Sequence, residues 1–302
     1  MTSKNKVHGY IALVGAPNAG KSTLSNTLLG QKLSIVSSKV QTTRNSIKAI
    51  IVEGDTQMIL IDTPGIFIPR EDRLLERIIV KSAWQGLREA NHICLLIDAT
   101  TGLDEHNLNI LKDLKKEEQD PTVIITKIDL IKKNKMLEII AKLSESGITN
   151  ILPISSLTKD GIDNLKELLL SKCKNPDWHY SEDQITDAPM RFIASEITRE
   201  KLFTRLYKEL PYSISVKTDE YQILDNGQIK IHQTIFVLKD SQKGIILGKR
   251  GEGIKEIGLE AKKDISEIAQ TKIHLYLFIK VKPNWMNSIE SYERLDNPKL
   301  VS

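Results

Sequence analysis

The chain has 302 residues; 40% are hydrophobic, 27% are charged, and the formal net charge is +4 at pH 7. This composition is typical of a soluble globular protein, and it excludes a membrane-spanning one because no apolar run approaches the roughly 20 residues that a span requires. The mild positive charge alone says little about nucleic acid as a partner. The length predicts two domains. The first residues lead directly into a strand pattern without a secretory signal, so we expect a cytoplasmic protein in which Cys94 and Cys173 are reduced thiols.

The first 172 residues alternate short apolar runs with stretches of helical pattern. The runs are too short and too rich in β-branched residues for helices, so we interpret them as buried strands of a mostly parallel sheet. Strands are expected at 10–15, 58–62, 92–98, 122–127 and 151–155, and helices at 21–29, 72–89, 105–117, 133–145 and 161–171. This alternation predicts an α/β domain over residues 1–172.

Residues 173–190 contain prolines and acids without a hydrophobic period, which predicts a linker. Beyond it, residues 191–283 show the order helix, strand, strand, short helix, long helix, strand, and residues 284–302 form a tail to which we assign no role. The expected elements are helices at 190–209 and 254–269 and strands at 211–218, 228–238 and 272–282. The long helix has one apolar face and the last strand alternates strictly, which predicts a smaller α+β domain.

Residues 15–22 read GAPNAGKS and fit the pattern G-x-x-x-x-G-K-[ST] between a strand and a helix. The glycines let the backbone wrap closely, so that its N–H groups point at a phosphate. Lys21 reaches the β- and γ-phosphate oxygens, and the Ser22 hydroxyl can ligate Mg²⁺. The predicted phosphate-binding residues are Gly15, Ala16, Pro17, Asn18, Ala19, Gly20, Lys21, Ser22 and Thr23.

Two further motifs decide which nucleotide is bound. In DTPG (62–65), Asp62 would hold Mg²⁺ through its water and the Gly65 amide would sense the γ-phosphate. In TKID (126–129), Asp129 can accept hydrogen bonds from guanine N1–H and the exocyclic amine, a donor pair that adenine lacks. The predicted nucleotide-binding residues here are Asp62, Thr63, Pro64, Gly65, Ile66, Thr126, Lys127, Ile128 and Asp129.

In this order and spacing, the three motifs resemble those of the translation-factor class of GTPases. That class usually has asparagine where this chain has Thr126, whose hydroxyl reaches less far, so we expect a somewhat reduced guanine affinity. The resemblance also implies that Ser155 and Ser156 lie at the guanine, with the Ser156 amide against O6.

The resemblance implies a switch threonine in residues 37–46 that ligates Mg²⁺ only when the γ-phosphate is present. Thr43 matches best and Thr42 is the alternative; a hydroxyl-rich loop exposed to solvent is the simpler interpretation. Ile66 stands where Ras-type enzymes have a water-orienting glutamine, so intrinsic hydrolysis should be slow. The predicted catalytic residues are Lys21, Thr43 and Gly65, and the predicted Mg²⁺ ligands are Ser22, Thr43 and Asp62.

Slow intrinsic hydrolysis implies a helper. Asn18 occupies the position that binds K⁺ in related GTPases, where the ion replaces an arginine finger, so we expect K⁺ as a further cofactor. The alternative is that Asn18 only stabilises the loop. Arg44 as an internal finger is less expected, because a switch arginine is usually a solvated side chain.

Residues 245–255 read IILGKRGEGIK, in which Gly248 and Gly251 flank Lys249 and Arg250. A helix C-cap is the simplest interpretation. The loop, however, joins two helical segments and precedes an amphipathic helix and an alternating strand, which resembles a KH domain of the second type. Such a GxxG loop clamps about four single-stranded nucleotides. The predicted RNA contacts are Gly248, Lys249, Arg250, Gly251 and Lys255, with Ile245, Ile246, Ile254 and Ile257 as a floor for bases.

A GTPase domain joined to such a KH domain resembles the Era family of bacterial GTPases, through GAPNAGKSTL, QTTR, DTPG, ASEITREKL, ELPYSISV and ILGKRGEGIKEIG. The resemblance implies binding to the 3′ end of 16S rRNA, a GTP-controlled role in assembly of the 30S ribosomal subunit, and loose association with the inner membrane surface. The alternatives are a membrane-surface signalling GTPase whose C-terminal domain binds a protein or lipid, a scaffold that never hydrolyses GTP, and an ATP-dependent RNA chaperone, which Asp129 disfavours. The sequence lacks coiled-coil heptads, so we expect a monomer.

Overall fold

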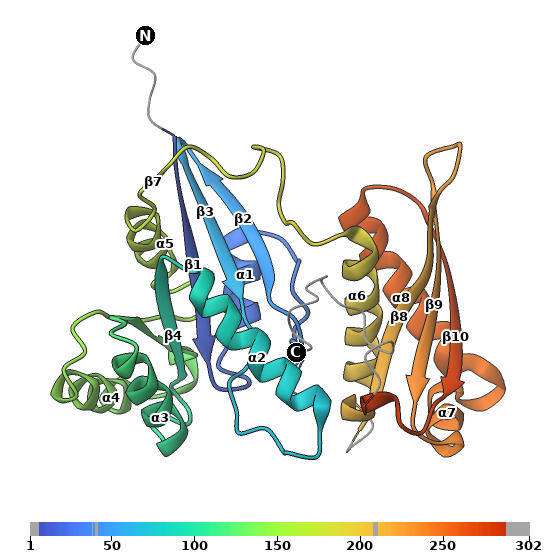
Figure 1. Ribbon diagram of the computed structural model, residues 1–302, viewed down its shortest axis with the longest axis horizontal. Coiled ribbons are helices and arrows are strands. Elements are labelled where there is room, and N and C mark those ends of the chain that lie inside the picture. Colours follow the sequence, from blue (N-terminus) through green and yellow to red (C-terminus); the bar gives the residue numbers. More distant parts are fainter. Residues whose placement is uncertain (1–5, 38, 40–41, 208–210, 288–302) are drawn as a thin grey trace, which may run out of the picture. The chain divides into compact units, whose positions relative to one another are not determined.

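The computed structural model describes residues 6–37, 39, 42–207 and 211–287. Three predicted segments lie partly outside these ranges. They are the end of the helix predicted at 190–209, the switch loop at 37–46 and the C-terminal tail at 284–302. The chain divides into two compact units (Figure 1). The N-terminal unit comprises Met1–Ser34, Thr43–Ile68 and Ile79–Asp187, and the C-terminal unit comprises Ile35–Thr42, Pro69–Ile78 and Ala188–Ser302.

The N-terminal unit is built on one sheet with the strand order β2-β3-β1-β4-β5-β6. The pairs β3–β1, β1–β4, β4–β5 and β5–β6 are parallel, β2 is antiparallel to β3, and the short β7 pairs antiparallel with the start of β1. The strands are β1 (Val7–Gly15), β2 (Ile47–Glu53), β3 (Thr56–Asp62), β4 (His92–Asp98), β5 (Thr122–Thr126), β6 (Ile151–Pro153) and β7 (Asn175–Pro176). This mostly parallel sheet confirms the predicted fold class of the first domain.

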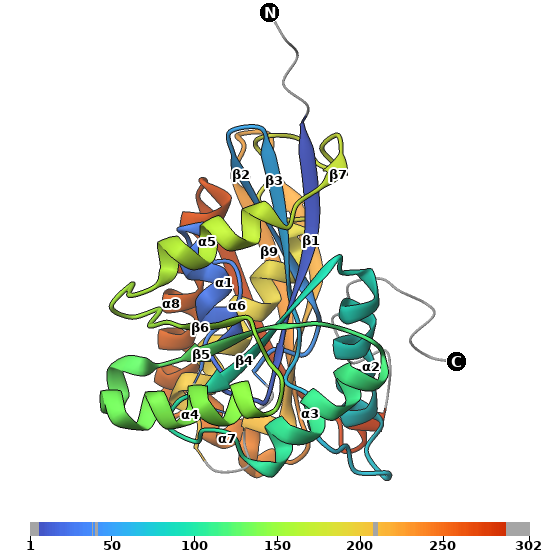
Figure 2. The ribbon, with the colours of Figure 1, turned by 90° about the vertical axis from the view of Figure 1, so that its left-hand side faces the viewer.

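Helices cover both faces of this sheet. Figure 2 shows α1 and α5 on one face and α2 and α3 on the other. The helices are α1 (Lys21–Leu29), α2 (Leu74–Glu89), α3 (Glu105–Lys116), α4 (Lys133–Glu145) and α5 (Ile162–Ser171), with a 3₁₀ turn at Ile128–Leu130. The helices predicted at 21–29 and 133–145 are confirmed with the same bounds, and the other predicted helices of this unit end within about two residues of the expected positions.

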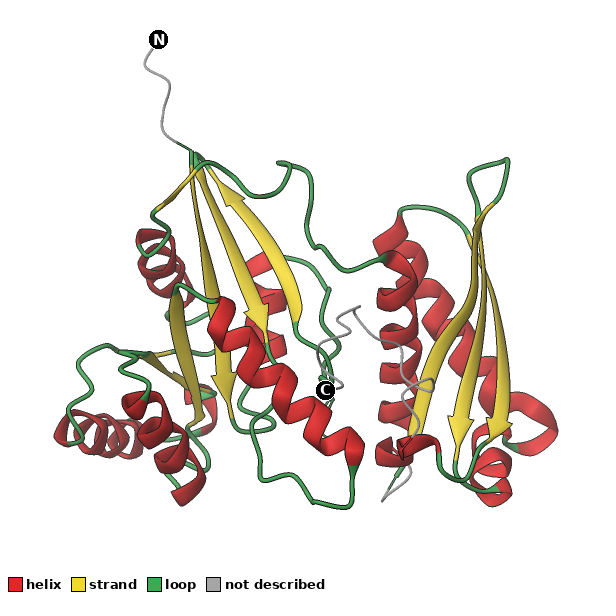
Figure 3. Ribbon diagram, viewed as in Figure 1, coloured by secondary structure: helices red, strands yellow, loops and turns green. Residues whose placement is uncertain are grey.

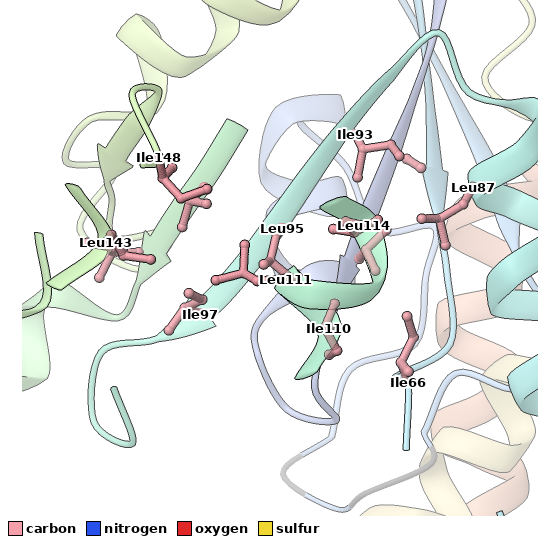
Figure 4. Close-up of a cluster of buried hydrophobic side chains, with 14 of the residues drawn as sticks. Ile66, Leu87, Ile93, Leu95, Ile97, Ile110, Leu111, Leu114, Leu143 and Ile148 are labelled. Atoms are coloured by element: carbon pink, nitrogen blue, oxygen red, sulfur yellow. The ribbon is translucent and has the colours of Figure 1, made fainter. Parts of the chain in front are cut away.

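Alternation along β4 explains how the helices α2, α3 and α4 are held. Ile93, Leu95 and Ile97 point to one face and pack against Ile110 and other apolar residues of α3 (Figure 4). Because both faces of the sheet are covered, its strands are apolar on both sides. Because the strands are parallel, their carboxyl ends meet at one edge of the sheet, where ligands bind in open α/β folds.

The strand β2 was not among the strands predicted from the sequence. A lysine, Lys48, interrupts its apolar run, and β2 is an edge strand that pairs with only one strand of the ladder, so its pattern is less continuous than that of the central strands. The β-branched run Ile50–Val52 is too short to assign by periodicity alone, but the following Gly54 has φ of +58° and marks a hairpin turn. A glycine turn directly after a β-branched run was therefore the sequence signal that could have indicated strand β2.

Part of the predicted linker lies along the N-terminal unit. The Asp177 amide donates to the Lys6 carbonyl at 2.8 Å, and the Trp178 indole N–H donates to the Asp55 carbonyl at 3.0 Å. The buried Gln57 side chain accepts from the amides of His179 and Tyr180, each at 2.9 Å. Residues up to Asp187 thus belong to this unit.

The C-terminal unit is a three-stranded sheet with helices on one face (Figure 3). The central strand β9 is antiparallel to β8 and parallel to β10. The elements in chain order are α6 (Met190–Arg205), β8 (Ile214–Ile223), β9 (Ile229–Val237), α7 (Asp240–Leu247), α8 (Glu252–Ala269) and β10 (Ile273–Val281), with 3₁₀ turns at Pro211–Ser213, Lys249–Gly251 and Trp285–Asn287. The order α-β-β-α-α-β confirms the predicted second type of KH domain.

The core of this unit lies between the sheet and its helices. Leu202, Val216, Ile235 and Ile257 are among its buried residues, and alternate residues of β10 pack against it. The strict alternation predicted for the last strand is therefore confirmed. Within the described ranges, no helix is long and apolar enough to cross a membrane.

Candidate functional site

The loop between β1 and α1 wraps around the ammonium group of Lys21. Lys21 Nζ donates to the carbonyls of Gly15 at 3.0 Å and Ala16 at 2.8 Å. Gly15 has φ of +149°, and a Cβ there would lie 2.4 Å from the Leu96 carbonyl oxygen, so only glycine fits. Gly20, with φ of +91°, turns the chain directly into α1. The loop therefore presents backbone and one buried cation to the space above α1, which is a geometry that suits a phosphate group.

Burial decides the charge of this lysine. Lys21 is buried, and desolvation lowers the pKa of its ammonium group from 10.5 to about 8, although the nearby Asp62 carboxylate acts in the opposite direction. An anion that bound beside Lys21 would favour the charged form and raise this pKa again.

A buried carboxylate lies near the Ser22 hydroxyl. Asp62 at the end of β3 is fully buried, and its carboxylate makes no hydrogen bond of standard geometry among the described residues, although the Ser22 and Ser34 hydroxyls are close to it. Burial raises the pKa of Asp62, while the hydroxyls of Ser34 and Ser22 and the charge of Lys21 oppose the shift. A buried, unpartnered carboxylate beside hydroxyl oxygens is a donor set that fits Mg²⁺.

The structure distinguishes the two candidate switch threonines. Thr43 Oγ1 lies 2.9 Å from Ser22 Oγ, so the two hydroxyls are within hydrogen-bond distance. The Thr42 hydroxyl instead donates to the Lys39 carbonyl at 2.6 Å. The geometry thus favours Thr43 over Thr42 as the third oxygen ligand.

The segment after Asp62 lies against the phosphate loop. A Cβ on Gly65 would lie 2.8 Å from both the N and Cα of Pro17, so the two backbones touch. Ile66 donates its amide to the Gly15 carbonyl at 3.2 Å, and its side chain is buried in the core (Figure 4). A buried aliphatic side chain cannot orient a water molecule, as the sequence predicted for this position.

The loop after β5 meets the phosphate loop from the other side. Thr126 Oγ1 donates to the Ala19 carbonyl at 2.9 Å, so the shorter threonine side chain does reach this backbone. Asp129 is exposed and lies in the 3₁₀ turn that follows. Ser155 is buried, its hydroxyl accepts from the Thr158 amide at 3.1 Å, and Ser156 is half-buried. The ends of β5 and β6 thus bring the predicted base-binding residues to one edge of the sheet.

One residue of this edge was missed by the sequence analysis. Asp98, the last residue of β4, forms an ion pair with Lys127 at 2.6 Å and accepts from the Thr100 amide at 2.8 Å. These hydrogen bonds lower the pKa of its carboxyl group, against the effect of burial. Lys127 adopts the left-handed conformation with φ of +57°, and Asp98 fixes its side chain there. An acid at the carboxyl end of a parallel strand was the available signal.

The glycine loop of the C-terminal unit needs its glycines. Gly248 has φ of +69° and Gly251 has φ of +81°, and a Cβ on Gly248 would lie 2.9 Å from the Gly253 nitrogen. Lys249 and Arg250 between them are exposed. The loop therefore holds two basic side chains in water at the N-terminus of α8, where the helix dipole favours an anion.

A groove of about 480 Å³ lies between α8 and β10 and opens to solvent. Its walls combine apolar and basic side chains. The lining residues are Ile254, Lys255, Gly258, Leu259, Lys262, His274, Leu275, Tyr276, Leu277 and Phe278. An apolar floor with a basic rim suits stacked bases and a phosphate backbone.

The predicted floor of four isoleucines is only partly correct. Ile246 and Ile257 are 1% and 2% exposed and belong to the core, so they cannot contact a ligand. Ile254 lines the groove, and Ile245 is 56% exposed at the end of α7. The sequence pattern alone could not show which of these isoleucines face the core of the unit.

Comparisons with known proteins agree with these two sites. Residues 10–127 match the family described as 50S ribosome-binding GTPase, and residues 209–286 match the KH domain. GTPase Era of Bradyrhizobium sp. (strain ORS 278) is 44% identical over 288 residues, which cover 95% of this chain and 93% of that protein. GTPase Era of Brucella suis biovar 1 is also 44% identical, over 95% of this chain and 92% of that protein. The chain belongs to the Era family of GTPases.

Solved Era structures share the fold over nearly the whole chain. An Era in complex with MgGDPNP and nucleotides 1506–1542 of 16S ribosomal RNA is 37% identical, with a TM-score of 0.90, over 94% of this chain and 97% of that one. A point variant of Aquifex aeolicus Era bound to GDP·AlF4⁻ is 36% identical, with a TM-score of 0.90 and the same coverage. The Era-family chain is accordingly a GTPase, with a KH domain in its C-terminal unit.

The pKa of Lys21 predicts how nucleotide affinity depends on pH in this Era-family chain. Without nucleotide, the ammonium loses its proton at about pH 8, below the ordinary value of 10.5. Because phosphate binding favours the charged form, binding above pH 8 requires proton uptake, and the affinity for GDP should fall by up to about tenfold per pH unit. Isothermal titration between pH 7 and 9.5 measures this slope. Lys21→Arg, which stays charged, should give a flat profile; a flat profile for the unmodified chain would contradict the prediction.

Proposed function

We propose that this chain is a GTP-hydrolysing assembly factor that binds the 3′ end of 16S rRNA and acts in biogenesis of the 30S ribosomal subunit. The observation that carries the proposal is the pairing of a basic GxxG loop and an open groove in the C-terminal unit with the GTPase motifs at 15–22, 62–65 and 126–129 in the N-terminal unit. An Era of the same fold has been solved with MgGDPNP and that region of 16S RNA, which supports transfer of the RNA partner to this chain.

On the nucleotide side, we assign the following roles. The residues 15–23 wrap the phosphates, Lys21 neutralises their charge, and Gly65 donates its amide to the γ-phosphate. Ser22, Thr43 and Asp62 would hold Mg²⁺, which supplies further charge neutralisation on the β- and γ-phosphates. Asp129 accepts from guanine. Since Ile66 cannot orient water, the chain's own residues position the phosphates but leave the attacking water unassigned.

On the RNA side, the glycine loop would bind the phosphate backbone and the groove would bind the bases. Gly248 and Gly251 let the phosphate backbone approach the N-terminus of α8, and Lys249 and Arg250 add charge-assisted contacts. Lys255 lies on the rim of the groove, one turn into α8, where it can contact the same backbone. The apolar walls of the groove would receive the bases.

We further propose that K⁺ accelerates hydrolysis through Asn18. Asn18 lies in the middle of the phosphate loop, where its backbone adopts the left-handed conformation with φ of +65°. We expect several-fold faster GTP turnover in KCl than in NaCl at equal ionic strength, and Asn18→Ala should remove the difference while GDP affinity is retained. Equal rates in the two salts would dispose of the idea.

The proposal places the chain in the cytoplasm as a monomer with loose contact to the inner membrane surface. The basis is the family resemblance, together with the exposed basic loop, which also suits anionic lipid. Sedimentation with anionic vesicles, with and without RNA, tests the membrane contact. Vesicle binding that persists when RNA binding is absent would favour a membrane-surface signalling GTPase instead.

The proposed RNA partner is tested by measuring binding of a short RNA that copies the 3′ end of 16S rRNA. The proposal expects this RNA to bind at least about tenfold tighter than a scrambled RNA of the same composition, because bases in the groove are read by stacking and hydrogen bonds. It also expects the RNA to change GTP turnover. Equal affinity for both RNAs would leave only a nonspecific electrostatic interaction and would reject the proposed substrate.

A further inference from the structure

Helix α6 buries a row of charged side chains. Glu196, Arg199 and Glu200 are 6%, 2% and 5% exposed, and their spacing places them on one side of the helix. Buried charges are costly unless they are paired and hydrogen-bonded. Glu196, Arg199 and Glu200 must therefore have specific hydrogen-bond or ion-pair partners, and these partners indicate the role of the three side chains.

Arg199 pairs with the Glu196 carboxylate, and the row also holds the backbone at Val36 and Thr42. Arg199 Nε donates to Glu196 Oε1 at 2.8 Å, and its Nη2 contacts Glu196 Oε2 and donates to the Thr42 carbonyl at 2.5 Å. The Glu200 carboxylate accepts from the Val36 amide at 2.9 Å. All these residues belong to the C-terminal unit, so α6 holds Val36 and Thr42 within its own unit.

The next residue along the chain belongs to the nucleotide site. Thr43 lies in the N-terminal unit, with its hydroxyl 2.9 Å from that of Ser22. The Thr42 carbonyl and the Thr43 amide share one planar peptide unit. A hydrogen bond that fixes this carbonyl therefore also restricts the direction in which Thr43 leaves the peptide.

We propose that Arg199 is a positioning residue for Thr43: it holds the Thr42 carbonyl so that the Thr43 hydroxyl stays beside Ser22, ready for Mg²⁺ and the γ-phosphate. This rests on the proposed role of Thr43 as a metal ligand. The Glu196 carboxylate accepts hydrogen bonds from two nitrogens of Arg199, which orients the guanidinium plane toward the Thr42 carbonyl.

The test compares GTP with GDP. Arg199→Gln should lower the affinity for a non-hydrolysable GTP analogue by about tenfold in the presence of Mg²⁺, as expected for loss of a charge-assisted hydrogen bond. GDP affinity should change by less than about twofold, because Thr43 serves only the γ-phosphate state. Without Mg²⁺, the difference between variant and unmodified chain should disappear. The assay contains no RNA, so the affinities for the GTP analogue and GDP can be interpreted even if the rRNA proposal fails.

Arg205→Gln is the matched control. Arg205 lies on the same helix and is also ion-paired, through Nη2 to Glu260 at 2.6 Å and through Nη1 to Glu256, both on α8. Its substitution should leave the ratio of GTP-analogue to GDP affinity unchanged. If Arg199→Gln does not fold because it leaves Glu196 buried without its partner, the double variant Glu196→Gln/Arg199→Gln removes both charges and carries the same expectation.

A double-mutant cycle with Thr43→Ala shows whether Arg199 acts through Thr43. The proposal expects the double variant Arg199→Gln/Thr43→Ala to lose no more preference for the GTP analogue than Thr43→Ala alone. Additive losses would mean that the two residues act independently. Either that result, or an equal loss of affinity for both nucleotides in Arg199→Gln, would overturn the proposal.

Discussion

Gly65→Ala is expected to lower GTP turnover by at least about a hundredfold, the effect of losing one preorganised donor to a developing charge. The added Cβ would lie 2.8 Å from the backbone N and Cα of Pro17, and backbone atoms cannot rotate away as a side chain can. The segment after Asp62 must then move away from the phosphate loop, and the Gly65 amide loses its place at the γ-phosphate. Single-turnover hydrolysis with saturating GTP and Mg²⁺ measures the loss.

Gly244→Ala is the control for this substitution. Its Cβ meets nothing within 4 Å and lies within α7, where alanine favours the helix, so turnover should be unchanged. GDP affinity of Gly65→Ala, measured beside it, separates a local effect at the γ-phosphate from collapse of the whole loop. Turnover of Gly65→Ala within a few-fold of the unmodified chain would show that this segment does not act where we place it.

Gly251→Asp should weaken RNA binding by about ten- to a hundredfold, as expected when a charge-assisted phosphate contact is lost and a negative charge is added. Gly251 has φ of +81° and nothing within 4 Å of an added Cβ, so the side chain would project into open space beside Lys249 and Arg250. Repulsion of the RNA backbone by the added charge, together with the strain of a non-glycine residue at this φ, then causes the loss. Fluorescence anisotropy with the 16S 3′-end RNA measures it.

Gly227→Asp matches this change in backbone and charge. Gly227 has φ of +76°, also has open space around its Cβ position, and lies in the turn between β8 and β9. It should leave RNA affinity nearly unchanged, and both variants should bind GDP normally. If the two aspartates weaken RNA binding equally, the effect is one of net charge and the loop is not the clamp.

Most of the nucleotide site was predictable because its chemistry depends on short motifs. Residues 15–22 and 62–65 fix their own backbone conformation through glycine, and each motif follows a strand, so parallel pairing brings them together. Asp98 was not predicted because its place at the end of a strand is a weak signal without a motif spacing to support it. It became visible only when β4 and β5 were seen to be neighbours, with Lys127 beside it.

The relations between distant segments could not be predicted from one sequence. Arg199 lies in a helix whose polar residues look like a solvated face, yet it is buried and bonded to the backbone at Thr42, far away along the chain. Likewise, Ile246 and Ile254 look alike in a helical period, but only the packing of α7 and α8 on the sheet buries the first and opens the second. Local pattern thus predicts elements, and tertiary contact decides which faces remain available.

We expect the GTP state to control RNA binding in this chain. The most direct test is the affinity of the full chain for the 16S 3′-end RNA, measured with Mg²⁺ and either a non-hydrolysable GTP analogue or GDP. We predict at least about fivefold tighter binding with the GTP analogue, the lower end of ordinary coupling between two sites, and an equal gain in analogue affinity when RNA is present. The same RNA affinity in both nucleotide states would contradict the account.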